Sequence, residues 1–199
     1  QDSLLADLLE YSTVESGNLT LRLAPFTLRE IFSDLAATLF WLAHDRGVTL
    51  SFVNDPKLES LHLQGDAARL RHVVMNLAQN ALKFTEAGSV SVETACVEIG
   101  PSEARFQCRV SDTGCGIPAH RLSDIFKPFV QVDESLFKRS AGSGLGLPLC
   151  QELLSLMGSE ILVESTLGKG SVFSFTLSTA SRGRCGRLGT PKTCQNSSA

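Results

Sequence analysis

Three polar side chains in the segment 72–85, Asn76, Asn80 and Lys83, recur at the spacing of one helical face. Residues separated by three or four positions lie above one another on a helix. An amide oxygen suits a hard cation such as magnesium, which takes few protein ligands besides phosphate and water. The spacing therefore predicts either a magnesium and phosphate site, with Asn80 as the metal ligand and Lys83 facing phosphate, or an ordinary solvated helix face.

A carboxylate precedes a glycine-containing turn in the run DTGCGIP, residues 112–118. Gly114 and Gly116 give this turn backbone freedom and allow a ligand to approach closely. An ionised carboxylate only accepts hydrogen bonds, so Asp112 suits the exocyclic amine of adenine and rejects the carbonyl of guanine. The alternative is a common Asp-Thr-Gly turn that is stabilised by its own side chain.

Gly142, Gly144 and Gly146 lead directly into an apolar helical run that begins at Leu145. Backbone N–H groups and the positive end of the helix dipole could face phosphates there. The same glycines could instead form a flexible hinge. The chain contains no G-x-x-x-x-G-K-[ST] sequence, which disfavours a Walker-type nucleotide triphosphatase.

Between these turns, the apolar run IFKPFVQ at residues 125–131 is followed by charged residues without a clean period. A mobile segment over a phosphate site can close on its ligand. Lys138 or Arg139 could then reach the terminal phosphates. Without the other motifs, Phe126 and Phe129 would be interpreted as ordinary core residues.

The elements that must position these residues are three helices and seven strands. Thr27 and Glu30 form a capping box for a helix that runs to residue 46, and Asp66 caps a second helix through residue 84. A third helix is expected at residues 145–157. Alternating apolar residues predict strands near residues 20–26, 48–53, 61–63, 89–99, 105–111, 159–165 and 171–177. The fold class is therefore α+β, a two-layer sandwich with three helices on one face of a mixed, mostly antiparallel sheet.

Composition excludes several classes of function. A net charge of −3 with mixed signs does not favour nucleic-acid binding. No run reaches the roughly 18 apolar residues of a membrane helix, and the first residues do not form a signal peptide. Because no apolar run is long enough, we expect no direct membrane contact. The six cysteines contain no C-x-x-C pair, so we expect free thiols in a reducing cytoplasm.

The runs HVVMNLAQNALKFT, DTGCGIP, IFKPFVQ and GSGLGL, followed by Gly168 and Gly170, stand in a fixed order. Together they resemble the N, G1, F, G2 and G3 boxes of the histidine kinase ATP-binding domain, which belongs to the GHKL group and has the Bergerat-type fold. The resemblance implies ATP and magnesium as ligands, a catalytic set of Asn76, Asn80 and Lys83, and Asn80 as the magnesium ligand. The ATP-binding residues that it implies are Asn80, Lys83, Asp112, Gly114, Gly116, Ile117, Phe129, Lys138, Arg139, Gly142, Ser143, Gly144, Leu145, Gly146, Leu147 and Thr176.

The resemblance also bears on the reaction. Related ATPases of this group carry a glutamate that activates water at the position of Asn76, and an amide cannot act as a general base. We therefore expect transfer of the γ-phosphoryl group to a histidine on a dimerisation hairpin, with a response-regulator receiver domain downstream, as in a hybrid sensor kinase. The alternatives are a catalytically degenerate nucleotide-binding module, or pseudokinase, and a protein serine kinase of the same fold.

Three regions are expected along the chain. Residues 1–16 resemble the end of the dimerisation hairpin, residues 17–178 form the ATP-binding domain, and residues 179–199 are a disordered tail or linker. None of the four histidines has the sequence context of a phosphoacceptor. We therefore expect a cytoplasmic protein, or the cytoplasmic part of a membrane-bound receptor, whose visible piece does not phosphorylate itself.

Overall fold

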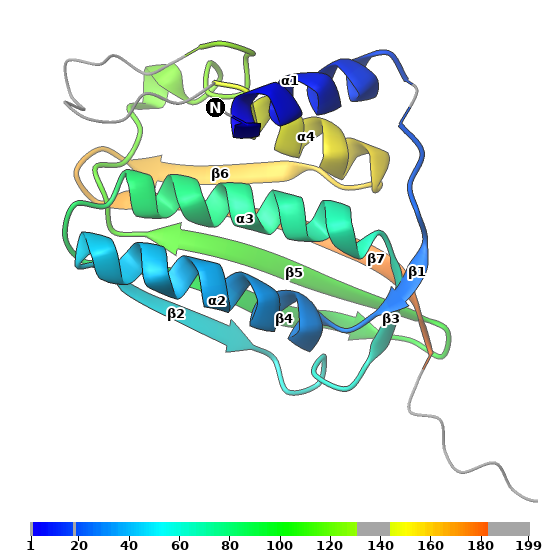
Figure 1. Ribbon diagram of the computed structural model, residues 1–199. Helices are drawn as coiled ribbons and strands as arrows, with labels where there is room; N and C mark the ends of the chain where they lie inside the picture. The colour runs from blue at the N-terminus through cyan, green and yellow to red at the C-terminus, as the bar shows by residue number, and fades with distance from the viewer. Residues whose placement is uncertain (1, 18, 131–143, 183–199) are drawn as a thin grey trace, which may run out of the picture.

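The computed structural model describes residues 2–17, 19–130 and 144–182 (Figure 1). Their seven strands form one sheet: β1 (Ala24–Phe26), β2 (Thr49–Asn54), β3 (His62–Gly65), β4 (Ser89–Ile99), β5 (Glu103–Asp112), β6 (Ile161–Thr166) and β7 (Gly170–Arg182). The strand order is β1-β3-β7-β5-β4-β2, and β6 pairs with β7. All pairs are antiparallel except β2 with β4, so the predicted mixed and mostly antiparallel sheet is confirmed.

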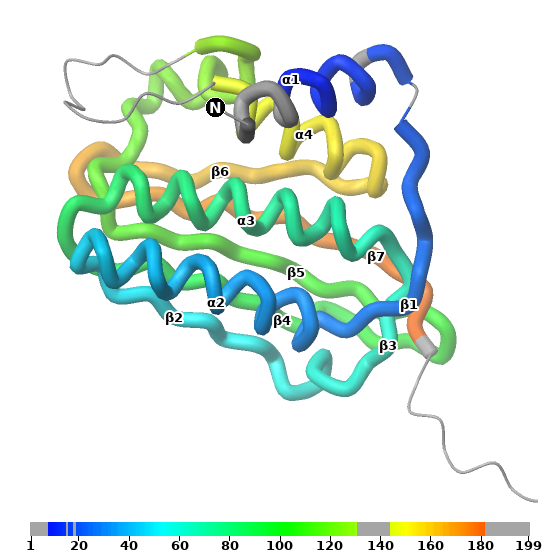
Figure 2. The backbone as a smooth tube through the Cα atoms, in the orientation of Figure 1, coloured from blue at the N-terminus to red at the C-terminus, as the bar shows by residue number. Residues whose placement is uncertain are grey.

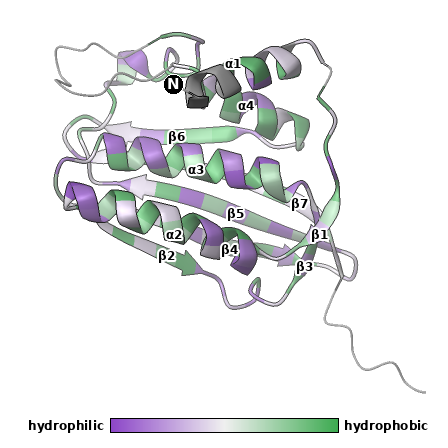
Figure 3. Cartoon of the chain, viewed as in Figure 1, coloured by the Kyte–Doolittle hydropathy of each residue, from purple (hydrophilic) through white to green (hydrophobic). Residues whose placement is uncertain are grey.

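Three helices lie on one face of this sheet: α2 (Leu28–Arg46), α3 (Ala67–Lys83) and α4 (Gly146–Leu156) (Figure 1). Figure 3 shows hydrophobic and hydrophilic residues alternating along α2 and α3, as expected of helices that bury one side. Ile31, Leu35 and Leu39 of α2 are buried against the sheet. Each fully buried side chain of this size contributes about 1.5–3 kcal/mol to folding.

The ends of α2 and α3 follow from their capping residues. The Thr27 side chain accepts a hydrogen bond from the backbone N–H of Glu30, and the Glu30 carboxylate accepts one from Thr27, which confirms the capping box. Gly47 ends α2 in the left-handed conformation, with φ of 67°. The Asp66 carboxylate accepts from the N–H of Arg69 and so caps the start of α3.

Helix α1 (Asp2–Glu15) precedes the sheet and contacts α4 (Figure 1). It is joined to α3 by Glu10, whose two carboxylate oxygens contact Arg69 and Nδ1 of His72, the latter at 3.1 Å. A turn follows this helix, in which Gly17 has φ of 70°.

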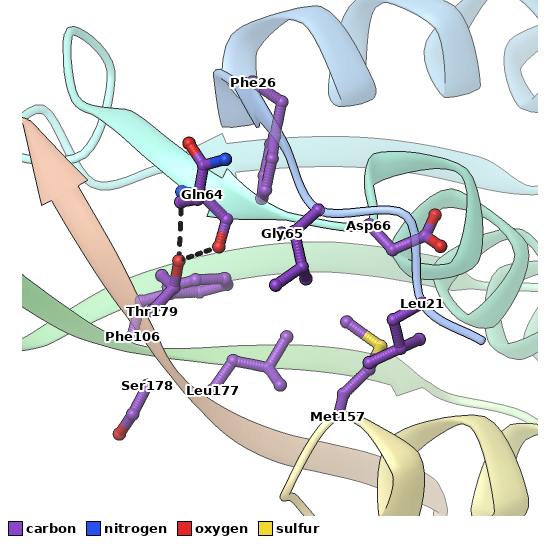
Figure 4. A pocket seen from close by; sticks show the side chains of 11 residues that line it. Leu21, Phe26, Gln64, Gly65, Asp66, Phe106, Met157, Leu177, Ser178 and Thr179 are labelled. Atoms are coloured by element: carbon purple, nitrogen blue, oxygen red, sulfur yellow. Dashed lines mark hydrogen bonds between the residues drawn. The ribbon is translucent and has the colours of Figure 1, made fainter.

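Strand β7 extends past residue 178, where the sequence pattern predicted the start of the tail. Figure 4 shows the reason: the Thr179 hydroxyl accepts from the backbone N–H of Gln64 at 3.1 Å and donates to its carbonyl at 2.5 Å. The N–H of Ser181 donates to the carbonyl of Ser102 at 2.9 Å. Residues 179–182 therefore belong to the sheet, and the expectation of disorder for residues 183–199 lies outside the described residues.

A small hollow lies between the chain preceding β1 and the end of β7, and Figure 4 shows the side chains that line it. Its volume is about 90 Å³. Its lining includes Leu21, Phe26 and Met157. Phe106, also in the lining, stands six residues before the end of β5, which corresponds to about 20 Å along a strand. This hollow therefore lies at the opposite end of the sheet from the carboxylate and glycine turns.

Candidate functional site

The predicted polar residues gather where several elements end. Strand β5 ends at Asp112, α3 ends at Lys83, α4 begins at Gly146, and the turn between β6 and β7 lies at the same end of the sheet (Figure 1). Asp112 is directly opposite Ser171 in the antiparallel pair of β5 and β7. The fold therefore brings the Asp112 carboxylate, the polar stripe of α3, the start of α4 and the β6–β7 turn to one region.

Asp112 is half-buried, and its Oδ1 accepts the backbone N–H of Gly114 at 2.9 Å. Burial raises the pKa of Asp112 from its ordinary value, while hydrogen bonds from the backbone N–H groups of Gly114 and Ser171 act in the opposite direction. An ionised carboxylate offers about four acceptor positions, so room for a ligand donor remains. This carboxylate is the kind of acceptor that the amino group of an adenine requires.

The turn after Asp112 is held from both sides. The N–H of Cys115 donates to the carbonyl of Phe84, at the end of α3, at 3.2 Å. On the other side, the N–H of Gly168 donates to the carbonyl of Cys115 at 2.7 Å. Gly168 belongs to the turn between β6 and β7, which lies at the same end of the sheet as the end of β5 (Figure 2). Gly116 has φ of 68°, and a Cβ there would lie 2.1 Å from the Thr166 carbonyl oxygen, so only glycine fits.

The stripe on α3 faces the beginning of α4. A Cβ on Gly146 would lie 2.6 Å from Oδ1 of Asn76, so the two helices approach closely at this point. Asn80 follows one turn later and is half-buried. Lys83 ends the stripe with its Nζ 5.0 Å from the centre of the Phe84 ring. The structure thus brings all three predicted catalytic residues to the site.

The surroundings of Lys83 disfavour its positive charge. Burial lowers the pKa of Lys83, and the nearby Arg46 guanidinium lowers it further. Arg46 itself donates to the carbonyl of Leu82 at 3.1 Å. Arg46, the last residue of α2, and Lys83, the last residue of α3, thus place two positive charges near the end of α3. Such a positive region favours an anionic ligand such as a phosphate.

The second glycine turn leads into α4 as predicted. Gly144 has φ of 67°, and its carbonyl accepts the N–H of Phe129 at 3.1 Å, which joins the two ends of the segment 131–143. Leu145 is buried, and Leu147 packs half-buried against the core. The first N–H groups of α4 have no acceptor within the helix and can receive an anion.

Phe129 differs from an ordinary core residue. Its side chain is 64% exposed, and its φ of 61° is the single positive value for a non-glycine residue in the described part of the chain. A side chain in the left-handed region is uncommon and held by its surroundings. The predicted residues Lys138, Arg139, Gly142 and Ser143 lie outside the described residues.

Thr176 is not brought to the site. It is opposite Gln107 in β7, whereas Asp112 is opposite Ser171, and side chains alternate between the two faces of a sheet. Its side chain is therefore on the face away from Asp112, and its carbonyl accepts the Ser159 hydroxyl at 2.8 Å. The strand residue that the sequence reasoning missed is Ser171, which is 6% exposed; its signal was its place directly after Gly170.

The described residues fit magnesium better than a transition metal. They contain no group of three histidine, cysteine or acidic side chains that could hold a metal ion. Asn80 offers one amide oxygen, which suits a small hard cation that takes its other ligands from phosphate and water. The four cysteines within the same part of the chain are free, as predicted. Among the described helices, none is both long and apolar enough to cross a membrane.

Comparisons with known proteins give the chain its relatives. It is 35% identical over 178 residues to the sensor protein GacS of Pseudomonas syringae pv. syringae, and 34% identical over 173 residues to the signal transduction histidine-protein kinase BarA of Escherichia coli (strain K12). These alignments cover 88% and 87% of this chain and 19% of each relative. The chain thus spans about a fifth of the length of these relatives.

Solved structures share the fold. The crystal structure of full-length ShkA in complex with AMPPNP superimposes with a TM-score of 0.75 and 32% identity, covering 90% of this chain and 36% of that one. The histidine kinase AdeS of Acinetobacter baumannii, at 20% identity and a TM-score of 0.69, covers 89% of this chain and 77% of its own and shows the fold alone.

A family profile covers the region in which the glycine turns, the α3 stripe and Asp112 meet. The profile described as "Histidine kinase-, DNA gyrase B-, and HSP90-like ATPase" matches residues 65–181. This span begins at the end of β3 and stops one residue before the end of β7, and so includes every described residue of the site. The chain therefore belongs to the histidine kinase-, DNA gyrase B- and HSP90-like ATPase family, with sensor histidine kinases among its relatives.

Proposed function

We propose that this chain binds ATP with magnesium and transfers the γ-phosphoryl group to a histidine on a helical dimerisation hairpin. The observation that carries the proposal is the Asp112 carboxylate, held by backbone N–H groups at the end of β5 beside the α3 stripe and the start of α4. The AMPPNP complex of a structure 32% identical to this chain supports ATP as the nucleotide.

In this proposal each element binds a different part of the nucleotide. Asp112 accepts a hydrogen bond from the 6-amino group of adenine, and Lys83 with the first N–H groups of α4 holds the phosphate chain. Asn80 holds magnesium, which neutralises charge that develops on the phosphates during transfer. Phosphoryl transfer demands mainly such positioning and charge stabilisation.

Asn76 favours transfer to a side chain over hydrolysis. Its amide oxygen lies against Gly146, at the place where a general base would have to activate water, and an amide cannot accept that proton. With water poorly activated, the nucleophile must be supplied by another group. In the relatives' class, sensor histidine kinases, that group is a histidine, so we propose the same acceptor chemistry here.

The remaining partners are part of the same proposal. Because the chain spans about a fifth of its relatives, the acceptor hairpin, the dimer and a receiver domain downstream would lie in the rest of such a protein. We also propose that α1 continues the acceptor hairpin and that residues 17–182 are the ATP-binding unit on the cytoplasmic side.

The test supplies the acceptor separately. The chain is mixed with an acceptor hairpin from a relative and with ATP labelled at the γ-phosphate; a hairpin whose acceptor histidine is replaced by glutamine is the control. We expect label on the unmodified hairpin that is lost in acid and kept in alkali. Acid-stable label would indicate the serine kinase, and nucleotide binding without any transfer would indicate the degenerate module.

A further inference from the structure

The turn that carries Asp112 rests on the β6–β7 hairpin through a side chain to which the proposed mechanism assigns no role. The backbone N–H of Ile117, at the end of this turn, donates to Oγ of Ser165 in β6 at 2.7 Å. The Gly168 to Cys115 hydrogen bond and the close approach of Gly116 to Thr166 lie beside it. Ser165 is thus a side chain of β6 that holds the far end of this turn against the sheet.

Ser165 is also next to Ser171. Asp112 is opposite Ser171 in the pair of β5 and β7, and Ser171 is opposite Ser165 in the pair of β7 and β6. Residues directly opposite in antiparallel strands lie on the same face, so the three side chains form one row across three strands. Oγ of Ser165 and Oγ of Ser171 are 3.0 Å apart.

The hydrogen count at Ser165 shows how it can orient its neighbour. A hydroxyl has one hydrogen to donate and two acceptor positions. One acceptor position of Ser165 takes the Ile117 N–H, and its hydrogen can go either to the Gly170 carbonyl or to Ser171, both at 3.0 Å. When it goes to Ser171, the hydrogen of Ser171 is not used for Ser165 and can be donated elsewhere, and Asp112 is the residue opposite Ser171 in β5.

A hydrogen donated to Asp112 would favour its ionised form, because hydrogen bonds to a carboxylate stabilise its charge. Burial acts against that form, since it raises the pKa of Asp112. Only the ionised carboxylate is a pure acceptor that prefers a 6-amino to a 6-oxo purine. A Ser171 hydroxyl that donates to Asp112 would therefore connect Ser165 to the choice of base.

We propose that Ser165 is a positioning residue that sets the preference for 6-aminopurine nucleotides, by fixing the Ile117 peptide and orienting the Ser171 hydroxyl toward Asp112. This inference rests on the proposed ATP site. Ser165 does not touch the base; it acts through the turn and through Ser171. Its loss should alter recognition of the 6-position while leaving the phosphate contacts of α3 and α4 in place.

The experiment compares two nucleotide analogues that differ at the 6-position. Non-hydrolysable ATP and inosine triphosphate analogues are titrated calorimetrically into the unmodified chain and into Ser165→Ala, Ser165→Cys and Ser165→Thr. We expect Ser165→Ala to lower the affinity for the ATP analogue about tenfold, which corresponds to weakening the one hydrogen bond between Asp112 and the 6-amino group, with much less change for the inosine analogue. Ser165→Thr keeps a hydroxyl and should retain the preference.

Ser159→Ala is the matched control, because its hydroxyl donates to the Thr176 carbonyl on the same hairpin, away from Asp112. It should leave the ratio of the two affinities unchanged. A second readout is amide hydrogen exchange, which should become faster at Ile117 in Ser165→Ala. Ser165→Cys keeps the volume with weak hydrogen bonds and carries the same test if the alanine variant does not fold.

The outcomes separate the two proposals. An unmodified chain that binds neither analogue contradicts the proposed function itself. If the unmodified chain prefers the ATP analogue and Ser165→Ala or Ser165→Cys shows the same preference, that result overturns the role of Ser165. The proposed ATP site would not be affected by that result. Equal losses for both analogues would show a general structural defect and would also overturn the inference.

Discussion

Replacing Asp112 with asparagine changes the charge of the candidate site with little change in its shape. Asparagine keeps an oxygen that can accept the Gly114 N–H, now 2.9 Å from Oδ1. It replaces the second carboxylate oxygen with an NH₂ donor, which cannot accept a hydrogen from the 6-amino group of adenine. The substitution should therefore separate ligand binding from folding.

The loss in binding can be worked from the bond that is removed. A hydrogen bond to a charged group contributes about 1.5–3 kcal/mol, and each 1.4 kcal/mol is a factor of about ten in affinity. We therefore expect Asp112→Asn to weaken binding of a non-hydrolysable ATP analogue by about 10- to 100-fold. The apposed NH₂ groups add to this loss.

The free energy of unfolding should not fall in the same variant. Burial raises the pKa of Asp112 in the folded state above its unfolded value, so the ionised side chain disfavours folding once the pH exceeds that range. At pH 7 the ligand-free Asp112→Asn variant should therefore be at least as stable as the unmodified chain. Any gain should vanish as the pH falls below the unfolded carboxyl pKa, because Asp112 is then neutral in both states.

The assay combines calorimetric titration at pH 7 with denaturant unfolding of the ligand-free protein at pH 7 and near pH 3.5. Asp45→Asn, at an exposed position near the end of α2, is the matched control and should alter neither quantity appreciably. The reasoning is refuted if Asp112→Asn binds the ATP analogue within about twofold of the unmodified chain. A clear loss of stability at pH 7 would contradict the account of the buried charge.

Three further substitutions test other contacts. Gly116→Ala should lower the free energy of unfolding by more than Gly158→Ala, because both have positive φ but only Gly116 lacks room for a Cβ; the left-handed strain alone is about 1–2 kcal/mol, and denaturant unfolding measures the difference. Lys83→Met should weaken binding of the ATP analogue about tenfold at pH 7. Because burial lowers the pKa of Lys83, the unmodified chain should begin to lose affinity at an alkaline pH below the usual lysine range. Titrations from pH 7 to 10 should therefore show a flatter pH profile in the variant. Glu10→Gln removes the ion pairs to α3 and should speed amide exchange in α1, with an effect on stability of about 1 kcal/mol and no change in nucleotide affinity; unchanged exchange would count against the pairing.

Local signals predicted much of the fold. The capping box of Thr27 and Glu30 and the cap by Asp66 depend on a few neighbouring residues, and both appear in the structure. The helical spacing of Asn76, Asn80 and Lys83 needed only the period of a helix. The position of Asp112 at a strand end followed from the change of pattern at its glycine turn.

Features that depend on strand register were less accessible. Thr176 and Ser171 are both hydroxyl residues of β7, and only the pairing with β5 shows that Ser171 faces Asp112. The sequence of residues 179–182 resembles a polar linker. These residues belong to the sheet because they bond to Gln64 and Ser102, which are distant along the chain, and local sequence does not reveal such bonds. The role of Ser165 likewise depends on a backbone N–H 48 residues away along the chain.

We propose above that the site binds an adenine nucleotide with magnesium. The most direct measurement is calorimetric titration of the unmodified chain with a non-hydrolysable ATP analogue, with and without magnesium, beside the corresponding GTP analogue. We expect saturable binding of the ATP analogue that magnesium strengthens, and binding of the GTP analogue at least tenfold weaker. Equal affinity for the two analogues, or binding of neither, would rule out an adenine-specific site.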